Sequence, residues 1–220
     1  MPYVWDWSAL WDNLPFLLEG IHLTVIASVI SMAAALIVAL PIALARLSGR
    51  WLGLVAQIYT ELFRNTPLLV LVLWVFTVMP LLSGLTLTPL LSGIVALTAN
   101  LSAFIAEIYR AGISSISAGQ THAALAIGMT RVQVLKRVVL PQAIMRVLPA
   151  LGSMWVSLFK DTSILSVIGV GELMYQGRIV ASDTYRPLEV FTGVAVIYYL
   201  LAYPQALGVN WLFAKFQVQE

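Results

Sequence analysis

The sequence predicts an all-α membrane protein with five transmembrane helices. Of its 220 residues, 60% are hydrophobic and only 10% are charged, and the mean hydropathy is +0.93. This apolar content exceeds what a water-soluble fold can bury. The apolar residues also form stretches of about 20, the length with which a helix crosses about 30 Å of hydrocarbon while satisfying its own backbone polar groups.

The expected spans follow in order along the chain. They are 23–45, 52–79, 90–108, 147–170 and 188–213. The first carries no charge, the second contains Glu61 and Arg64, and the fourth surrounds the pair Lys160 and Asp161. We expect residues 1–220 to form one transmembrane domain, and an odd number of crossings places its termini on opposite sides of the membrane.

Basic residues in the short loops predict the orientation of the chain. The following lie on one expected face: Arg46, Arg50, Arg110, Arg131, Lys136, Arg137, Arg146 and Lys215. The other face is mainly acidic and carries Asp6, Asp12, Glu19, Glu172, Asp183 and Glu189, with Arg178 and Arg186. The basic face is therefore expected to be cytoplasmic, with the N-terminus outside and the C-terminus inside. No basic region precedes the first apolar stretch, so a cleaved signal peptide is not expected.

The stretch GQTHAALAIGMTRVQVLKRVVLPQA (119–143) is unusually polar for this chain. Its apolar residues recur near helical spacing, and Gly128 interrupts a first short helix. Thr130 is placed to cap a second helix, which begins at Arg131 and ends at Pro141. The cytoplasmic loop 114–141 is therefore either an amphipathic connector lying on the lipid headgroups or a docking element for a soluble partner.

Two charges and a proline mark the second span. Glu61 and Arg64 lie three residues apart and share a helix face. They either neutralise each other near the interface, or Arg64 reaches the carboxylate of a solute. Thr66 and Pro67 follow, and the proline frees a backbone carbonyl that could face a cavity rather than lipid.

The third and fourth spans also carry polar residues. Asn100 and Glu107 lie seven apart on one helix face, and Asp161 and Thr162 form part of a polar island. Each has a structural alternative: Glu107 pairs with Arg110, Asn100 bonds neighbouring helices, and the lysine beside Asp161 extends to the interface. An α-amino acid needs an acceptor for its ammonium and a donor for its carboxylate, and this set provides both.

Composition and motifs argue against several functions. The chain has no cysteine, hence no disulfide, cysteine-ligated metal or thiol catalysis, and no metal site is expected. A formal charge of +2 is too small to argue for nucleic acid. His22 and His122 fall on opposite sides by this topology, and the polar island has no nucleophile–base pair, so an enzyme is not expected. No G-x-x-x-x-G-K-[ST] loop is present to bind ATP.

The 119–143 stretch resembles the EAA loop of permease subunits in bacterial binding-protein-dependent ABC importers. Four other segments resemble the polar amino acid branch of that family in the same order: FRNTPLLV (63–70), AEIYRAGISSISAGQ (106–120), LPQAIMRVLPAL (140–151) and KDTSILSVI (160–168). The resemblance covers about 13–213. A membrane scaffold would explain five spans but not this match.

The resemblance implies the type I ABC importer permease fold in the bacterial cytoplasmic (inner) membrane. Its implied partners are two ATPase subunits that bind ATP and Mg, a second permease subunit, identical or paralogous, and an external solute-binding protein. The loop would supply a coupling helix to the ATPase through His122, Ala123, Ala124, Gly128, Arg131 and Pro141. His122 replaces the family's usual glutamate, so its imidazole either hydrogen-bonds the same partner or contributes only packing.

The resemblance also implies a solute pathway. In similar permeases, acidic residues at the positions of Glu107 and Asp161 contribute to a pocket for amino acids. The expected pathway residues are Arg64, Thr66, Asn100, Glu107, Asp161 and Thr162. The opening WDWSALWDNLPFLLEGIHLT (5–24) is most like glutamate and aspartate importers, which favours an acidic solute; another small zwitterion, or a basic or amide amino acid, is the alternative.

Overall fold

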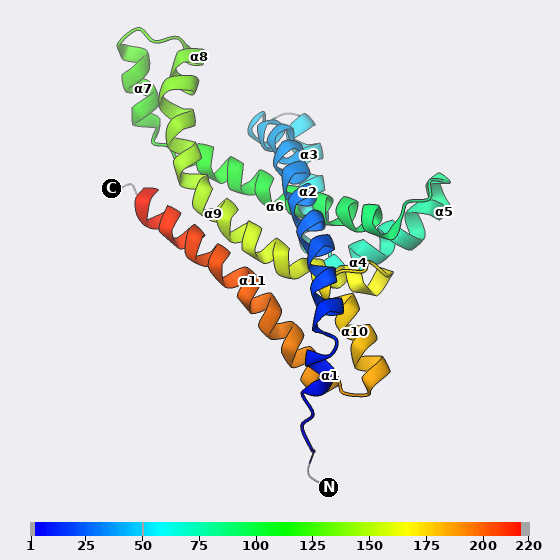
Figure 1. The fold of residues 1–220 in the computed structure, drawn as a ribbon. Helices are drawn as coiled ribbons and strands as arrows, with labels where there is room; N and C mark the ends of the chain where they lie inside the picture. Colours follow the sequence, from blue (N-terminus) through cyan, green and yellow to red (C-terminus); the bar gives the residue numbers. More distant parts are fainter. Residues whose placement is uncertain (1–2, 50, 217–220) are drawn as a thin grey trace.

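The computed structural model describes residues 3–49 and 51–216, with the side chains of 212, 215 and 216 left outside the description. Regular structure in these ranges is helical (Figure 1). The elements are α1 Ser8–Trp11, α2 Leu14–Leu47, α3 Trp51–Asn65, α4 Leu68–Leu73, π-helical η1 Trp74–Val78, α5 Met79–Ser83, α6 Pro89–Ser114, α7 Ala118–Ala126, α8 Arg131–Val134, π-helical η2 Leu135–Val139, α9 Leu140–Asp161, 3-10 helical η3 Thr162–Ile168, α10 Leu173–Thr184 and α11 Pro187–Phe216.

The first span begins earlier than predicted. Helix α2 covers 34 residues, about 51 Å, instead of starting at residue 23. Pro15 in its first turn is compatible with a helix start, and the Glu19 side chain is exposed, so its charge is not buried by the longer helix. The buried face of α2 consists mainly of small residues and packs chiefly on α6, so the two backbones approach closely.

The second expected span is broken. Helix α3 and the continuous stretch α4–η1–α5 meet at 105° across Thr66 and Pro67. Within the described ranges, four helical stretches are each long and apolar enough to cross a membrane: Leu14–Leu47, Pro89–Ser114, Arg131–Ile168 and Pro187–Trp211. The bent pair makes a fifth span if its two arms are counted as one.

Pro141 does not end a helix, which corrects the sequence-based expectation. The helical stretch runs without a break from Arg131 to Ile168. Proline normally clashes with the carbonyl four residues before it, but the chain widens here into the π-helical turn η2, in which the Leu140 N–H donates to the Leu135 carbonyl. This wider turn accommodates the ring, so the second helix of the loop continues directly into the fourth span.

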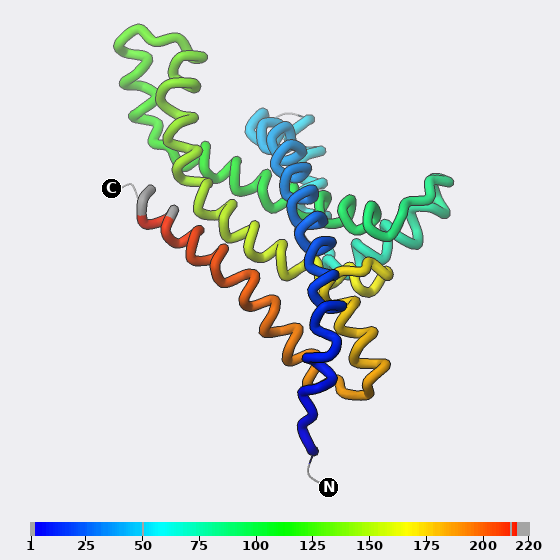
Figure 2. Tube along the Cα trace, viewed as in Figure 1, coloured from blue at the N-terminus to red at the C-terminus, as the bar shows by residue number. Residues whose placement is uncertain are grey.

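The two ends of the molecule are distinct in Figures 1 and 2. The N-terminal segment, α1 and the C-terminal end of α10 lie at one end of the molecule, and the hairpin of α7 and α8 projects at the other. Helix α11 runs from the first end towards the hairpin end. Which end is cytoplasmic stays a prediction, and of the basic residues used for it, Arg50 and the side chain of Lys215 lie outside the described residues.

A buried polar junction joins α2, α10 and α11 at the N-terminal end. The Glu172 side chain is fully buried. Its carboxylate accepts the backbone N–H groups of Met174 at 3.0 Å and Tyr175 at 2.8 Å and the Tyr198 hydroxyl at 2.6 Å. Gly20 of α2 packs on the same turn, where an added Cβ would lie 2.7 Å from a backbone nitrogen. Because a buried carboxylate needs such donors, the junction fixes the three helices relative to one another.

Candidate functional site

The break between α3 and α4 is stabilised from α6. Pro67 has no N–H to donate to the carbonyl of Phe63, four residues before it. The Asn100 side-chain amide donates to that carbonyl instead, at 2.7 Å, while the Thr66 hydroxyl donates to the Leu62 carbonyl at 2.7 Å. The freed carbonyl is therefore bound by Asn100 and does not face a cavity, and Asn100 bonds two helices together.

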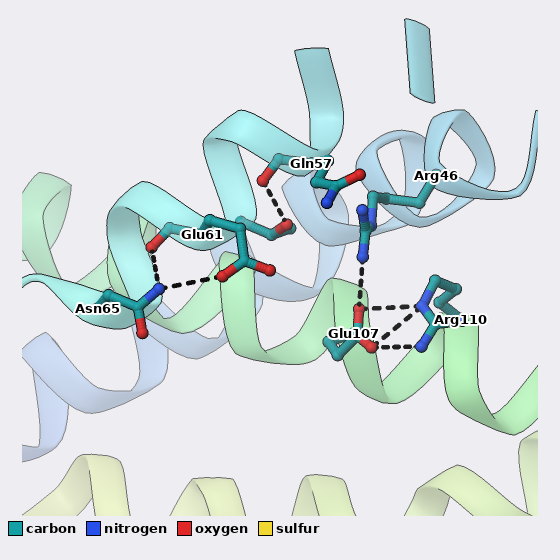
Figure 3. A network of polar contacts seen from close by, with 7 residues as sticks. Arg46, Gln57, Glu61, Asn65, Glu107 and Arg110 are labelled. Atoms are coloured by element: carbon teal, nitrogen blue, oxygen red, sulfur yellow. Dashed lines mark hydrogen bonds and ion pairs between the residues drawn. The ribbon is translucent and has the colours of Figure 1, made fainter. Parts of the chain in front are cut away.

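Glu61 and Arg64 do not form an ion pair in the described structure. The Glu61 carboxylate accepts the Asn65 side-chain amide at 3.0 Å (Figure 3). The Arg64 guanidinium carbon lies 5.4 Å from the centre of the Phe104 ring on α6, a cation–π contact. Mutual neutralisation is thus not observed, and Arg64 has no acidic side chain bonded to it among the described residues.

Glu107 lies at the centre of a charged network at the hairpin end of α2 and α6 (Figure 3). The Arg110 Nε donates to both carboxylate oxygens at 3.0 Å, and an Arg46 nitrogen lies 3.5 Å from Oε2. The Glu107 side chain is 23% exposed, so solvent weakens these pairs only in part. The expected Glu107–Arg110 pair is present, but two guanidiniums already occupy the carboxylate in this conformation.

Arg64 and Glu107 line one cleft between α3, α6 and α9. Its volume is about 430 Å³. The lining consists of Arg64, Phe104, Glu107, Ile108, Ala111, Ala150, Ser153 and Met154. Helices α6 and α9 pack closely beside the cleft, because a Cβ added at Gly112 would lie 2.2 Å from a Val147 methyl carbon. The cleft combines a cation, an aromatic ring and a carboxylate, which together suit a small zwitterion.

The other expected pathway residues lie outside this cleft lining. Asp161 ends α9 about two turns beyond Ser153, is half-buried, and has no hydrogen-bond partner among the described residues. Thr162 is fully buried, and its hydroxyl donates to the Phe159 carbonyl at 2.9 Å. Of the six residues expected from the sequence, the fold brings only Arg64 and Glu107 into one cleft.

The hairpin of α7 and α8 has the geometry that the sequence indicated. Gly128 adopts a φ of +88°, which favours glycine, and ends α7 just after Ala126. Thr130 caps α8 in a reciprocal capping box with Gln133. Ala124 is buried against the following helix, whereas His122, Ala123 and Arg131 are exposed.

Sequence reasoning missed two residues of the site. Arg46 was assigned only to the orientation of the chain, although it reaches Glu107. Phe104, whose ring contacts the Arg64 guanidinium, was not considered. Its position one turn before Glu107 was the available signal.

Ionisable side chains that face a shared cleft between membrane-length helices are typical of a membrane transport component. The family described as "Binding-protein-dependent transport system inner membrane component" matches residues 32–216. The chain belongs to this family, whose members are permease subunits of ABC transporters.

Individual relatives agree over nearly the whole chain. The chain is 38% identical over 198 residues to the glutamine transport system permease protein GlnP of Escherichia coli (strain K12), covering 89% of this chain and 90% of that protein. It is 40% identical over 209 residues to the probable glutamine ABC transporter permease protein GlnM of Bacillus subtilis (strain 168), covering 93% and 95%. Identity to the glutamate/aspartate import permease protein GltK of Escherichia coli O6:H1 is 32% over 221 residues, covering 96% and 97%.

A solved structure has the same fold. The crystal structure of an amino acid ABC transporter with histidines matches with a TM-score of 0.91 and 32% identity, covering 97% of this chain and 100% of that chain.

Proposed function

We propose that this chain is a permease subunit of an ATP-driven importer for a polar α-amino acid delivered by an external solute-binding protein. Two separate ATPase subunits bind ATP and Mg, and a second permease subunit, identical or paralogous, completes the pathway in the bacterial inner membrane. Family membership and the names of the relatives support this proposal. The coupling hairpin α7–α8 contacts the ATPase from the cytoplasmic side.

The position of Arg64 is the main support for the proposed solute site. Its guanidinium lines the cleft and bonds to no acidic side chain among the described residues. An unpaired cation within a membrane span is costly unless it faces water, protein or a ligand. A guanidinium binds a carboxylate with two parallel hydrogen bonds, so Arg64 takes the α-carboxylate of the solute. Asp161, whose carboxylate has no hydrogen-bond partner among the described residues, lies outside this cleft and is a candidate for another part of the solute pathway.

Two solute classes have specific support. Relatives named for glutamine are 38% and 40% identical to the chain, against 32% for the one named for glutamate and aspartate. This difference favours glutamine as the first candidate. An acidic amino acid is the second, because the guanidiniums of Arg46, Arg64 and Arg110 outnumber the single carboxylate of Glu107 around the cleft.

Uptake by proteoliposomes that contain the complete complex tests the proposal. Wild type is expected to import labelled glutamine or glutamate in preference to arginine when the binding protein and ATP are supplied. Arg64→Lys should lower kcat/KM roughly tenfold, because an ammonium replaces a bidentate contact with a single point charge, and Arg64→Met should nearly abolish uptake. Arg146→Lys is the matched control, since Arg146 is outside the cleft lining and its side chain bonds only the exposed Ser115 carbonyl among the described residues. Normal uptake by Arg64→Met, or preferential import of arginine, contradicts the proposed site.

The double variant Glu61→Gln with Arg64→Met separates this proposal from mutual neutralisation. If Arg64 served only to neutralise Glu61, removing both charges would leave no orphan charge and uptake would recover. Because Glu61 bonds Asn65 instead, the double variant is expected to remain as inactive as Arg64→Met.

A further inference from the structure

The coupling hairpin contains a cleft of its own, distinct from the one at Arg64. It has a volume of about 390 Å³ and lies between α7 and the continuous α8–η2 helix. Its lining consists of Thr121, His122, Leu125, Arg131, Val134, Leu135 and Val139. Val134 and Val139 are buried at its base, whereas His122 and Arg131 are exposed at its edges. The cleft therefore has an apolar base and two nitrogen-bearing side chains at its opening.

The hairpin holds these two edges in a fixed relation. Ala124 of α7 packs with Val134 and Val139 in a small buried cluster. The turn between the helices is closed by backbone bonds from Gly128 N–H to the Leu125 carbonyl at 3.0 Å and from Met129 N–H to the Ala124 carbonyl at 3.2 Å. Such a site requires little ordering when a partner binds, which lowers the entropic cost of binding.

Nothing within the hairpin neutralises the opening of the cleft. The side chains of His122 and Arg131 have no hydrogen bond and no ion pair within the part of the chain that the structure describes. The sequence contains no aspartate or glutamate between Glu107 and Asp161. Over the same interval it contains Arg110, Arg131, Lys136, Arg137, Arg146 and Lys160. A ligand that complements this cleft must bring its own negative charge.

We propose that the cleft receives an aspartate or glutamate side chain of the partner ATPase, whose carboxylate is bound between His122 and Arg131. The inference rests on the proposed function, in which the hairpin contacts an ATPase, and it adds the chemistry of that contact. An imidazole carries at least one N–H donor in either protonation state, and a guanidinium carries five. The methylene groups of the acidic residue lie on the apolar base. The permease thus supplies the donors and the ATPase the carboxylate.

The geometry favours a protein side chain over an anionic lipid headgroup. The hairpin projects past the ends of α2 and α3 (Figure 1), and the cleft is concave with an apolar base. A lipid headgroup layer would contact exposed cations on any side of the hairpin, including Arg137, which does not line the cleft. A seated side chain contacts only the residues around the cleft.

Binding of the purified cognate ATPase subunit to the permease complex in neutral phosphatidylcholine nanodiscs tests this proposal. Arg131→Glu and His122→Glu should each weaken the affinity at least tenfold and reduce its dependence on salt. His122→Gln retains an N–H donor and should lose less than threefold. Arg137→Glu, the matched control for a charge change on the other side of the same helix, should also lose less than threefold. Circular dichroism and size-exclusion chromatography establish that each variant is folded.

Each outcome of this experiment decides the proposal. If Arg131→Glu and Arg137→Glu lose equal affinity for the ATPase, the contact is general charge attraction and the proposed cleft site is wrong. Wild-type affinity in Arg131→Glu or His122→Glu would also overturn the proposal. If Arg131→Glu abolished binding of the permease to vesicles containing phosphatidylglycerol but left ATPase binding intact, the cleft would be a lipid site. A photo-reactive residue at Leu125 should crosslink to an ATPase peptide that contains Asp or Glu. Failure of the wild-type complex to bind any ATPase counts against the proposed function itself.

Discussion

The hydrogen bond from Asn100 to the Phe63 carbonyl should contribute measurably to the stability of this chain. Asn100→Leu keeps the number and branching of the side-chain heavy atoms but deletes the donor that lies 2.7 Å from the carbonyl oxygen. No backbone N–H can take its place, because residue 67 is proline. A partly buried carbonyl left without a donor costs about 1–3 kcal/mol, which lowers the unfolding temperature of a chain of this size by about 2–12 °C.

Thermal unfolding in detergent, followed by circular dichroism at 222 nm, measures this loss. Asn100→Asp should lose at least as much, because a carboxylate replaces a donor with a second acceptor. Thr98→Val is the matched control on the same helix, since the Thr98 hydroxyl is buried without a partner among the described residues and should be dispensable. The reasoning is refuted if Asn100→Leu unfolds at the wild-type temperature, or if Thr98→Val loses as much as Asn100→Leu.

Three further outcomes are expected. Gly20→Ala should lower the unfolding temperature, because the added Cβ would lie 2.7 Å from a backbone nitrogen, whereas Gly208→Ala, which meets no atom within 4 Å, should not. A cysteine at the exposed Ser8 should react with an impermeant maleimide outside intact cells and one at Ser117 should not; labelling of Ser117 would reverse the predicted orientation. Burial raises the pKa of the Glu172 carboxyl, although Tyr198 and two backbone N–H groups oppose the shift. The folded chain therefore keeps that proton to higher pH than the unfolded chain, and the resulting stability is lost as the pH rises through the folded-state pKa. The unfolding temperature of wild type should consequently fall relative to Glu172→Gln as the pH is raised from about 4 to about 8, and a constant difference would contradict the direction of the shift.

Local signals predicted most of the fold. The lengths of the apolar stretches located the membrane spans. Gly128 and Thr130 located the turn and the helix cap of the hairpin, because the effect of both residues is on their nearest neighbours in the chain. The angle between α3 and α4 and the early start of α2 depend on packing against α6 and α10. The predicted helix end at Pro141 was wrong for a related reason. The rule that proline ends a helix applies to an α-helical turn, whereas the chain forms a wider π-helical turn just before Pro141.

The site was less predictable because its contacts join distant parts of the chain. Helical spacing correctly paired Glu107 with Arg110, which lie on one helix. The same rule suggested Glu61 with Arg64, where Asn65 and Phe104 provided better partners. The contact of Arg46 with Glu107 arises only after α2 packs on α6, and no local pattern contains that information.

The uninterrupted helical stretch from Arg131 to Ile168 has a mechanical meaning. An α-helix is stiff along its axis, so a push on the hairpin at Arg131 is carried along about 33 Å of helix to Ser153, which forms part of the cleft wall. The π-helical turn η2 lies between these two points and is where bending is easiest, since its hydrogen-bonding is less regular. We therefore expect bending of this stretch to concentrate at residues 135–139, so that a displacement along the helix axis reaches the cleft more fully than a sideways one.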